Sequence, residues 1–442
     1  MTPGARLCAA IEIAAEIDDG AAASDSIVET YFRRRRYAGS KDRRAIGERV
    51  YGLIRRHARL NWWIERTGSA LTPNARLRVI ADLALNDKNR PEEIAALFSG
   101  GRHCPAELST EELALADGLA GRPITHHTDM PDATALEYPA WLDGSLKRRF
   151  GDRLVDEMTA LNQPAPMGLR VNTLKTTFEE VYDSLVRENY SVETTLFSPF
   201  SLRVRGHVRI GGSTAYQQGW VEVQDEGSQL ISLLTDAREG MTVVDFCAGA
   251  GGKTLALGAS MARDGVIRGR LIACDIFAQR LQRMKARVKR AGAEGIQRHN
   301  LSSESDPWVI QQSETADRVL LDVPCSGTGT WRRHPVDKWR LTPIDLETYI
   351  ATQRHILTSA SVMVKKGGRL IYATCSVLPE ENEEQVEWFL SENPTYKVLD
   401  CRTLWQECVG GETPVEGPYL HLSPATSLTD GFFCAVLQNT AD

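Results

Sequence analysis

The chain has 442 residues, 42% of them hydrophobic, and a formal net charge of -6. This length favours two or three domains with packed cores. The acidic balance argues against a generic nucleic-acid coat protein, because counterion release rewards basic surfaces. No apolar run approaches the roughly 20 residues that cross a bilayer, and acidic residues near the N-terminus argue against a signal peptide. We therefore expect a cytoplasmic protein with no membrane partner.

The nine cysteines are odd in number and never form a Cys-x2-Cys pair. This distribution argues against a disulfide framework and against a structural zinc site, so it predicts mostly free thiols and no bound metal. His126 and His127 have no further ligand at useful spacing, which favours ordinary histidines over a metal site.

Residues 1–135 place apolar residues at helical spacing and predict an all-helical domain. Residues 31–66 carry twelve lysines and arginines against three acids. Apolar residues at helical spacing lie among the arginines, which predicts an amphipathic helix with a basic outer face and candidate phosphate contacts; a solvated helix face is the alternative. The residues behind this prediction are Ile46, Val50, Leu53, Ile54, Arg55, Arg56 and Arg59.

Residues 136–220 predict a small α/β module. Its expected elements are helices at 137–162 and 177–188 and strands at 167–172 and 201–208. From residue 221 to 442, short apolar strands alternate with helices, which predicts a parallel sheet covered on both faces, with ligands bound beyond the carboxyl ends of its strands. The expected strands are residues 242–246, 271–275, 317–322 and 369–374.

A glycine-rich loop follows the first of these strands. A phosphate-binding P-loop would need Gly at Cys247, and a dinucleotide fingerprint beginning at Gly249 would need Gly at Thr254. An adenosyl ligand without phosphates fits better, with Asp275 at the end of the next strand as acceptor for the ribose hydroxyls. A tight turn without a ligand is the alternative. The loop comprises Cys247, Ala248, Gly249, Ala250, Gly251, Gly252 and Lys253.

Two cysteines follow strand ends on the ligand side of the expected sheet. Cys325 comes after Asp322 and Pro324, and Cys375 comes after Thr374. Methylation of cytosine at carbon-5 needs a thiolate that adds to carbon-6, a group that hydrogen-bonds the base edge and a general base. Two cysteines and an aspartate suit these roles, although most buried cysteines are only small hydrophobes.

Three segments carry a resemblance to the Nop/Sun (RsmB/NOP) family of RNA cytosine-5 methyltransferases, and within it to the RsmB-like branch. They are FCAGAGGKT, LLDVPCSGTGTWRRHP and ATCSVLPEENE, with weaker matches at LRVNTLK and VQDEGSQL. The resemblance implies a seven-stranded, mostly parallel, doubly wound sheet (a Rossmann-like class I methyltransferase). It would follow a NusB-like helical RNA-binding domain and a small α/β RNA-binding module.

The resemblance also implies the roles of individual residues. Cys375 would be the covalent nucleophile, Cys325 would help to release the methylated RNA, and Asp322 would contact the cytosine. Residues 247–253 and Asp275 would hold S-adenosyl-L-methionine, close to Asp322. Two positions depart from the family pattern: Ala250 replaces a usual proline, and Asn300 stands where an aspartate usually lies near the adenine amine.

The predicted function is methyl transfer to carbon-5 of a cytosine in small-subunit (16S) ribosomal RNA, by a monomer. Two alternatives stay open: a transfer-RNA cytosine-5 methyltransferase, and a non-catalytic RNA-binding factor of ribosome assembly. Trp331, Arg332 and Arg333 are candidates for stacking on or clamping the RNA, with ordinary packing and surface charge an equal alternative.

Overall fold

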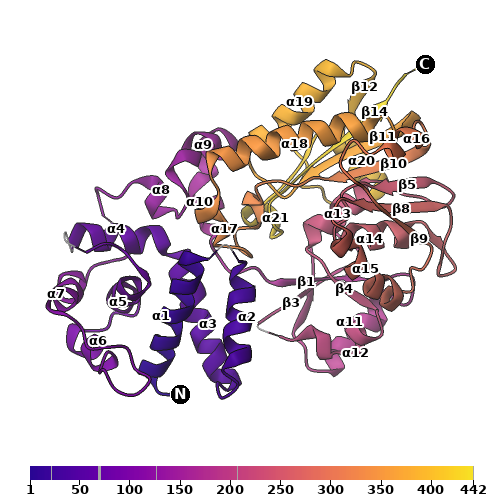
Figure 1. Cartoon of the computed structure of the whole chain (residues 1–442). Helices are drawn as coiled ribbons and strands as arrows, with labels where there is room; N and C mark the ends of the chain where they lie inside the picture. The colour runs from indigo at the N-terminus through magenta and orange to yellow at the C-terminus, as the bar shows by residue number, and fades with distance from the viewer. Residues whose placement is uncertain (21, 68–70, 126, 207, 442) are drawn as a thin grey trace. The chain divides into compact units, whose positions relative to one another are not determined.

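The computed structural model describes residues 1–20, 22–67, 71–125, 127–206 and 208–441 (Figure 1). The chain forms two compact units. The first comprises Met1–Gly144 together with His334–Arg340, and the second comprises Ser145–Arg333 together with Leu341–Asp442. His126, half of the histidine pair discussed above, lies outside the described residues.

The first unit is helical, as predicted for residues 1–135. Side-chain caps define several helix starts: Thr2 caps α1, Asn74 caps α5, and Ser109 with Glu112 forms a capping box at α7. The helices are α1 Pro3–Asp19, α2 Ser24–Arg34, α3 Ser40–Arg55, α4 His57–Thr67, α5 Ala75–Leu85, α6 Pro91–Leu97, α7 Thr110–Leu119, α8 Asp132–Ala135 and the 3-10 turn η1 Ala140–Leu142. None of the described helices is both long and apolar enough to span a bilayer.

The basic run of residues 31–66 forms α3 and α4 with an apolar buried side, as predicted. Several arginines of this run are less exposed to solvent than the sequence indicates. Arg49 and Arg56 both pair with Asp82, whose side chain is fully buried, and Arg59 pairs with buried Glu137 at 2.8 Å. The prediction of a basic outer face is therefore wrong for these three arginines, because Asp82 of α5 and Glu137 in the turn after α8 bind them inside the unit.

Residues 334–340, which come shortly after Pro324 and Cys325 in the chain, pack into the helical unit. Trp339 donates its indole N–H to the Ile54 carbonyl at 3.3 Å. Arg340 donates to the carbonyls of Ile17, Gly20 and Ala22, where α1 ends. Since the last carbonyls of a helix have no partner within the helix, the guanidinium caps α1.

The second unit begins with short helices and a small antiparallel sheet. The predicted helix at 137–162 is a series of shorter ones. The predicted strand at 167–172 is confirmed as β1, whereas the strand predicted at 201–208 ends at Val204, and residue 207 lies outside the described residues. The small sheet has the order β2-β3-β1-β4. Its elements, with the short helices that precede it, are α9 Asp143–Phe150, η2 Gly151–Arg153, α10 Leu154–Leu161, β1 Met167–Val171, α11 Phe178–Arg187, β2 Val192–Thr194, β3 Ser201–Val204, η3 Ile210–Gly212, α12 Thr214–Gln217 and β4 Val221–Val223.

The large sheet has the order β12-β14-β11-β10-β5-β8-β9, and β13 pairs with β14. Strands β9, β8, β5, β10 and β11 are parallel, and β14 runs antiparallel to β11. Its strands are β5 Thr242–Asp245, β8 Arg270–Asp275, β9 Ile296–Asn300, β10 Ala316–Asp322, β11 Val364–Thr374, β12 Tyr396–Leu399, β13 Leu420–Leu422 and β14 Phe432–Asn439. A separate hairpin pairs β6 Ala262–Arg263 with β7 Val266–Ile267.

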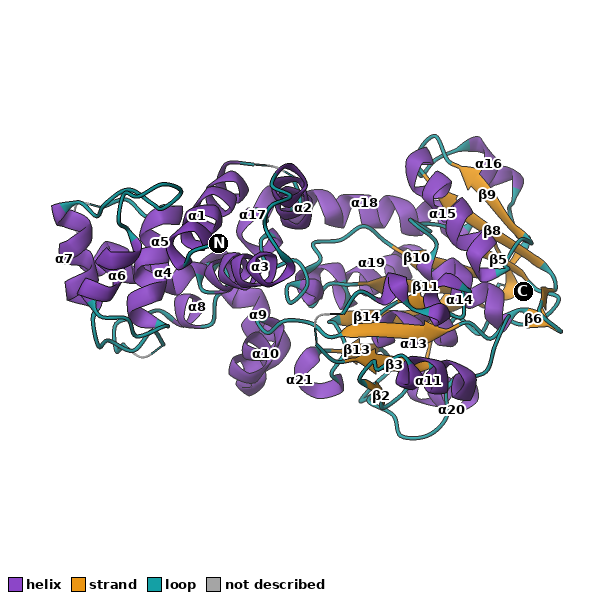
Figure 2. Cartoon of the chain, turned by 90° about the horizontal axis from the view of Figure 1, so that it is seen from below, coloured by secondary structure: helices purple, strands orange, loops and turns teal. Residues whose placement is uncertain are grey.

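Helices cover both faces of this sheet (Figure 2). One layer holds α13 Glu226–Leu234, α14 Gly252–Ser260, α15 Ala278–Ala291 and α20 Cys401–Cys408. The other holds α16 Pro307–Gln311, α18 Pro343–Ser361 and α19 Glu383–Glu392. The short elements η4 Thr328–Thr330, α17 Asp337–Arg340, η5 Pro379–Glu381 and α21 Pro424–Ser427 complete the chain. The predicted fold class, a doubly wound and mostly parallel sheet after a helical domain and a small α/β module, is confirmed. The sheet has eight strands where seven were predicted, because the short β13 pairs with β14 beside the row of seven.

Candidate active site

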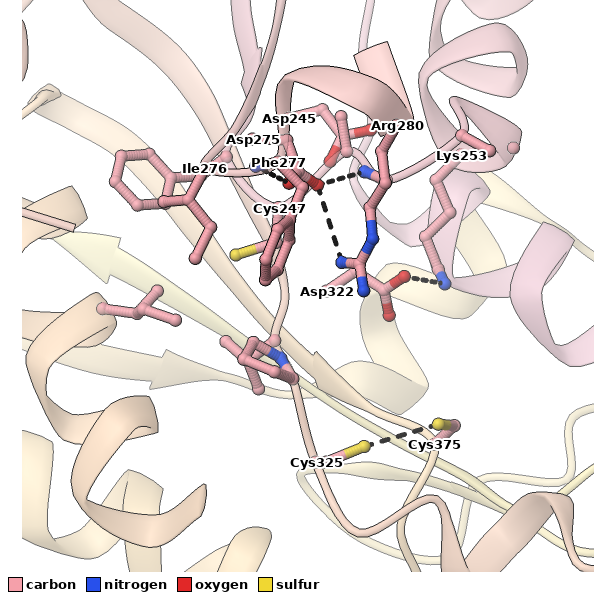
Figure 3. A pocket seen from close by; sticks show the side chains of 18 of the residues that line it. Asp245, Cys247, Lys253, Asp275, Ile276, Phe277, Arg280, Asp322, Cys325 and Cys375 are labelled. Atoms are coloured by element: carbon pink, nitrogen blue, oxygen red, sulfur yellow. Dashed lines mark hydrogen bonds and ion pairs between the residues drawn. The ribbon is translucent and has the colours of Figure 1, made fainter. Parts of the chain in front are cut away.

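A cavity of about 470 Å³ opens at the carboxyl edge of the large sheet (Figure 3). Four parallel strands contribute to it where they end: Cys247 follows β5, Asp275 ends β8, Asp322 ends β10, and Cys375 follows β11. Cys325 lines the same cavity from the loop after β10. The topology thus brings together the strand-end residues that the sequence singled out, because parallel strands all end at one edge.

The glycine-rich loop joins β5 to α14. Gly249 and Gly251 both have positive φ angles, of 56° and 84°, which glycine adopts without the strain of a Cβ atom. A Cβ at Gly251 would also lie only 2.7 Å from the Met284 side chain. Burial raises the pKa of the Cys247 thiol, which keeps it protonated and argues against a nucleophilic role.

Acidic side chains line the cavity beside this loop. Asp275 accepts hydrogen bonds from the Gly249 and Phe277 amides at 2.8 and 2.7 Å, so it fixes the loop while its remaining lone pairs stay available. Asp245 accepts from the Thr254 hydroxyl at 2.6 Å. Its other oxygen, Oδ1, is buried without a hydrogen-bond partner among the described residues. Burial raises the pKa of Asp245 to about 7.

Asn300 lies at the end of β9 but is not among the residues that line this cavity. Its side-chain amide donates to the carbonyls of Asp275, Ile276 and Leu301, so it stabilises the turn beyond β8. Glu304 lines the cavity instead, on the segment that follows β9. The position of Glu304 in the cavity was not predicted, because the residue belongs to no recognisable motif. The adenine contact of Asn300 stays a prediction.

An ion pair joins the cofactor side of the cavity to the cysteine side. Lys253 Nζ lies 2.7 Å from Asp322 Oδ2, and the lysine side chain is only 8% exposed. Burial lowers the pKa of Lys253, but Asp322 outweighs it, and the net pKa is raised. The ammonium therefore stays charged and holds Asp322 in place, at a point from which the carboxylate can meet a bound base.

Cys325 and Cys375 face each other, with their Sγ atoms 3.4 Å apart (Figure 3). The contact with Cys375, together with burial, raises the pKa of Cys325 well above that of an ordinary thiol. Cys325 therefore keeps its proton at neutral pH and can donate it to the Cys375 sulfur. Both sulfurs line the cavity, and the choice of Cys375 as the nucleophile comes from the family resemblance.

Residues 379–382, with the sequence PEEN, stabilise the loop that contains Cys325 and the loop that follows Cys375. Buried Glu381 accepts from the Ser326 amide at 2.8 Å, from the Ser326 hydroxyl and from Gln353 at 3.0 Å. Asn382 accepts from the Thr374 hydroxyl at 2.6 Å and donates to the Ser376 carbonyl at 3.0 Å. The sequence drew attention to these residues only as neighbours of Cys375; their partners across the sheet were not predictable from spacing.

Trp331, Arg332 and Arg333 do not form the predicted RNA clamp. Trp331 and Arg332 are buried, and both arginines pair with Asp430 and with Asp225 of the VQDEGSQL segment. For Trp331 and Arg332 the alternative, ordinary packing, holds: the Trp331 ring is buried, and the buried Arg332 guanidinium pairs with Asp225 and Asp430. These pairs hold the loop that follows Cys325 against the start of α13.

The donor set suits an adenosyl ligand. The glycine turns permit close approach to the backbone, Asp275 offers acceptors for hydroxyl groups, and the orphan Asp245 oxygen offers one for a further donor. Among the described residues no cluster of side chains could hold a metal ion. Fold and site together define a class I methyltransferase that uses S-adenosyl-L-methionine, with paired cysteines in its substrate pocket.

Comparisons with known proteins agree with this class. The family described as 16S rRNA methyltransferase RsmB/F matches residues 232–438, and the ferredoxin-like domain of RsmF/B-like methyltransferases matches residues 138–211. The chain is 30% identical to the probable ribosomal RNA small subunit methyltransferase B of Synechocystis sp. over 425 residues, which cover 90% of this chain and 91% of that one. It is 33% identical to ribosomal RNA small subunit methyltransferase B of Yersinia enterocolitica over 60% of this chain and 61% of that one.

Two solved structures are similar. The crystal structure of PH0851 superimposes with a TM-score of 0.76 at 27% identity and covers 99% of both chains. That of NSun6 from Pyrococcus horikoshii with SFG has a TM-score of 0.59 at 20% identity, over 69% of this chain and 99% of that one, which shows a shared fold. This chain belongs to the RsmB/F family of 16S rRNA methyltransferases.

Proposed function

We propose that this protein transfers a methyl group to carbon-5 of a cytosine in small-subunit ribosomal RNA through a covalent adduct with Cys375. The observation that carries the proposal is the pair of thiols 3.4 Å apart, in one cavity with the glycine-rich loop. Bound S-adenosyl-L-methionine supplies the methyl group. Residues 247–253, Asp245 and Asp275 would hold it.

The two cysteines would act in sequence. The Cys375 thiolate adds to carbon-6 of the cytosine, which makes carbon-5 electron-rich enough to take the methyl group. Loss of the carbon-5 proton to a base then breaks the carbon-sulfur bond and returns the thiolate. Cys325, whose raised pKa keeps it protonated in the resting enzyme, is suited to a proton-transfer role in this release step.

Asp322 would hydrogen-bond the edge of the base while charge develops on the ring. Its ion pair with Lys253 fixes its position before the substrate arrives, which is the pre-organisation that makes such contacts effective. Because the target base must enter a cavity, we expect it to be flipped out of its RNA stem.

The helical unit would supply phosphate contacts. Arg34, Arg36 and Lys41 are exposed around the turn between α2 and α3, and no carboxylate among the described residues pairs with them. We infer that they, rather than Arg49, Arg56 and Arg59, position the RNA. We further propose that the protein acts as a monomer in the cytoplasm, where ribosomal RNA is assembled into subunits.

The test is a labelling experiment with radioactive S-adenosyl-L-methionine and unmodified total RNA. It compares the wild type with Cys375→Ala, Cys325→Ala and, as a control in the helical unit, Cys8→Ala, which does not line the cavity. We expect label in 5-methylcytosine of small-subunit RNA for the wild type and for Cys8→Ala, none for Cys375→Ala, and a covalent protein-RNA band for Cys325→Ala.

Other outcomes would redirect the proposal. Label in transfer RNA would keep the chemistry and change the substrate. An adduct trapped by Cys375→Ala would reverse the two cysteines. Absence of label in every RNA, with cofactor binding intact, would favour a non-catalytic assembly factor.

A further inference from the structure

We infer that Glu222 and Arg287 are positioning residues: they brace the cofactor loop, residues 247–253, through the Ala250 carbonyl. Neither residue was singled out by the sequence. The inference rests on the proposed role of this loop in binding S-adenosyl-L-methionine. Because Glu222 lies on β4, the inference gives the small antiparallel sheet a role in cofactor binding, in addition to the RNA binding expected of this module.

The direct contact comes from α15. Arg287 Nη1 donates to the Ala250 carbonyl at 2.9 Å. One helical turn earlier, the Met284 side chain packs against Gly251. Residues three apart lie on the same side of a helix, so α15 presents one polar and one apolar contact to the middle of the loop.

Glu222 of β4 holds this arginine. Its Oε2 accepts from Arg287 Nε and Nη2 at 3.0 and 2.8 Å, and its Oε1 accepts from Arg290. The carboxylate is 2% exposed, while Arg287 is 24% exposed. With two of its nitrogens bound to one buried carboxylate, the guanidinium has little freedom to swing away from Ala250.

Loop residues beside the small sheet also contact the C-terminal end of α15. Asn172, in the LRVNTLK segment, donates to the Ala291 carbonyl at 2.8 Å, and Lys175 donates to the Arg290 carbonyl at 2.6 Å. These are carbonyls that a helix leaves unpaired at its C-terminus. Gly219 packs so closely on Arg290 that a Cβ atom there would lie 1.9 Å from its carbonyl oxygen. The helix, the small sheet and the loop are therefore braced together.

Residue 250 explains why a brace is needed. A proline at this position would fix φ near -65° without any outside contact. Alanine leaves this angle free, so the unbound loop loses more conformational entropy when it orders around a ligand. The Arg287 contact restricts the same peptide from outside. Within the described chain no hydrogen bond is donated by the Ala250 N–H, so a proline here would sacrifice none.

This reasoning predicts a rescue. Cofactor affinity would be measured by calorimetry with S-adenosyl-L-homocysteine, for which no turnover is needed. We expect Glu222→Gln and Arg287→Ala to raise Kd about tenfold, and the double variant Arg287→Ala with Ala250→Pro to regain most of that loss. Methyl transfer at saturating cofactor should change less than about threefold, which places the effect in KM. Arg283→Ala, on an exposed part of α15, is the matched control.

Thermal unfolding of each variant identifies any that fail to fold. If Arg287→Ala does not fold, the isosteric variant Glu222→Gln still tests the inference. Unchanged Kd in both folded single variants would overturn the inference. A loss that Ala250→Pro cannot restore would also overturn it, since Arg287 lines the cavity and would then contact the cofactor itself. Failure of the wild type to bind the ligand would instead refute the cofactor site.

Discussion

Lys253 and Asp322 form an ion pair 2.7 Å long that joins the first turn of α14 to the end of β10. One residue belongs to the glycine-rich loop and the other to the segment before the Pro-Cys pair, so a single contact couples the two halves of the cavity. Removal of Asp322 leaves the Lys253 ammonium, which is only 8% exposed, without its partner, and removal of Lys253 frees the partly exposed Asp322 carboxylate to move.

This coupling predicts non-additive variants. We expect Lys253→Ala and Asp322→Ala each to lower the single-turnover rate of methyl transfer by at least about a hundredfold, and the double variant to be little worse than the poorer single one. Rates measured on one RNA fragment at saturating cofactor complete the double-mutant cycle. Losses that multiply would show that the two residues act independently.

Glu381 is expected to be sensitive even to an isosteric change. Its carboxylate accepts hydrogen bonds from Ser326 and Gln353, and glutamine would turn an N–H2 group toward one of these donors. Glu381→Gln should destabilise the fold by about 2 kcal/mol and slow adduct formation, because the Cys325 loop loses its anchor. Urea unfolding and the yield of covalent adduct measure the two effects. Glu384→Gln, at a partly exposed neighbour whose ion pair with Arg148 lies at the surface, should change neither appreciably. Equal behaviour of the two variants would remove this role from Glu381.

Asp245 makes stability depend on pH. Its pKa in the folded protein is about 7, above the value of an exposed aspartate. The unfolded chain therefore releases this proton at lower pH, and the contribution of Asp245 to stability falls as pH rises from about 4 to 7, by up to about 1.4 kcal/mol per unit. Asp245→Asn should gain stability over the wild type, and gain more at about pH 7 than at about pH 5. Urea denaturation at both values tests this; a gain independent of pH would contradict it.

Arg340 is expected to stabilise the end of α1. Arg340→Ala removes hydrogen bonds to three carbonyls at that helix end, which should cost about 1–3 kcal/mol of local stability. Hydrogen exchange of the intact protein should show faster exchange in the last turns of α1. Arg34→Ala, an exposed residue of the same unit, serves as control. Unchanged protection of α1 would show that the cap contributes nothing.

Much of the fold was predictable from sequence because its signals are local. Short apolar strands separated by helices indicated the parallel sheet, and the residues after each strand indicated which edge carries chemistry. The topology of a parallel sheet then places Cys247, Asp275, Asp322 and Cys375 together, whatever the loops between them do. Several strand and helix boundaries moved by a few residues, as expected where propensity alone defines an end.

Tertiary structure alone decided which charges pair. Periodicity predicted that Arg56 lies on a helix, and Arg332 was singled out because it follows Cys325 in the chain. The carboxylates that bind them, such as Asp82 and Asp430, come from residues distant in the chain. The same holds for residues 334–340, whose place in the helical unit has no local signal. Sequence patterns indicate whether a segment faces solvent or the core. The partner that a side chain contacts across the fold depends on how the elements pack. For this reason the contacts of Glu381, Glu222 and Arg287 could be found only in the tertiary structure.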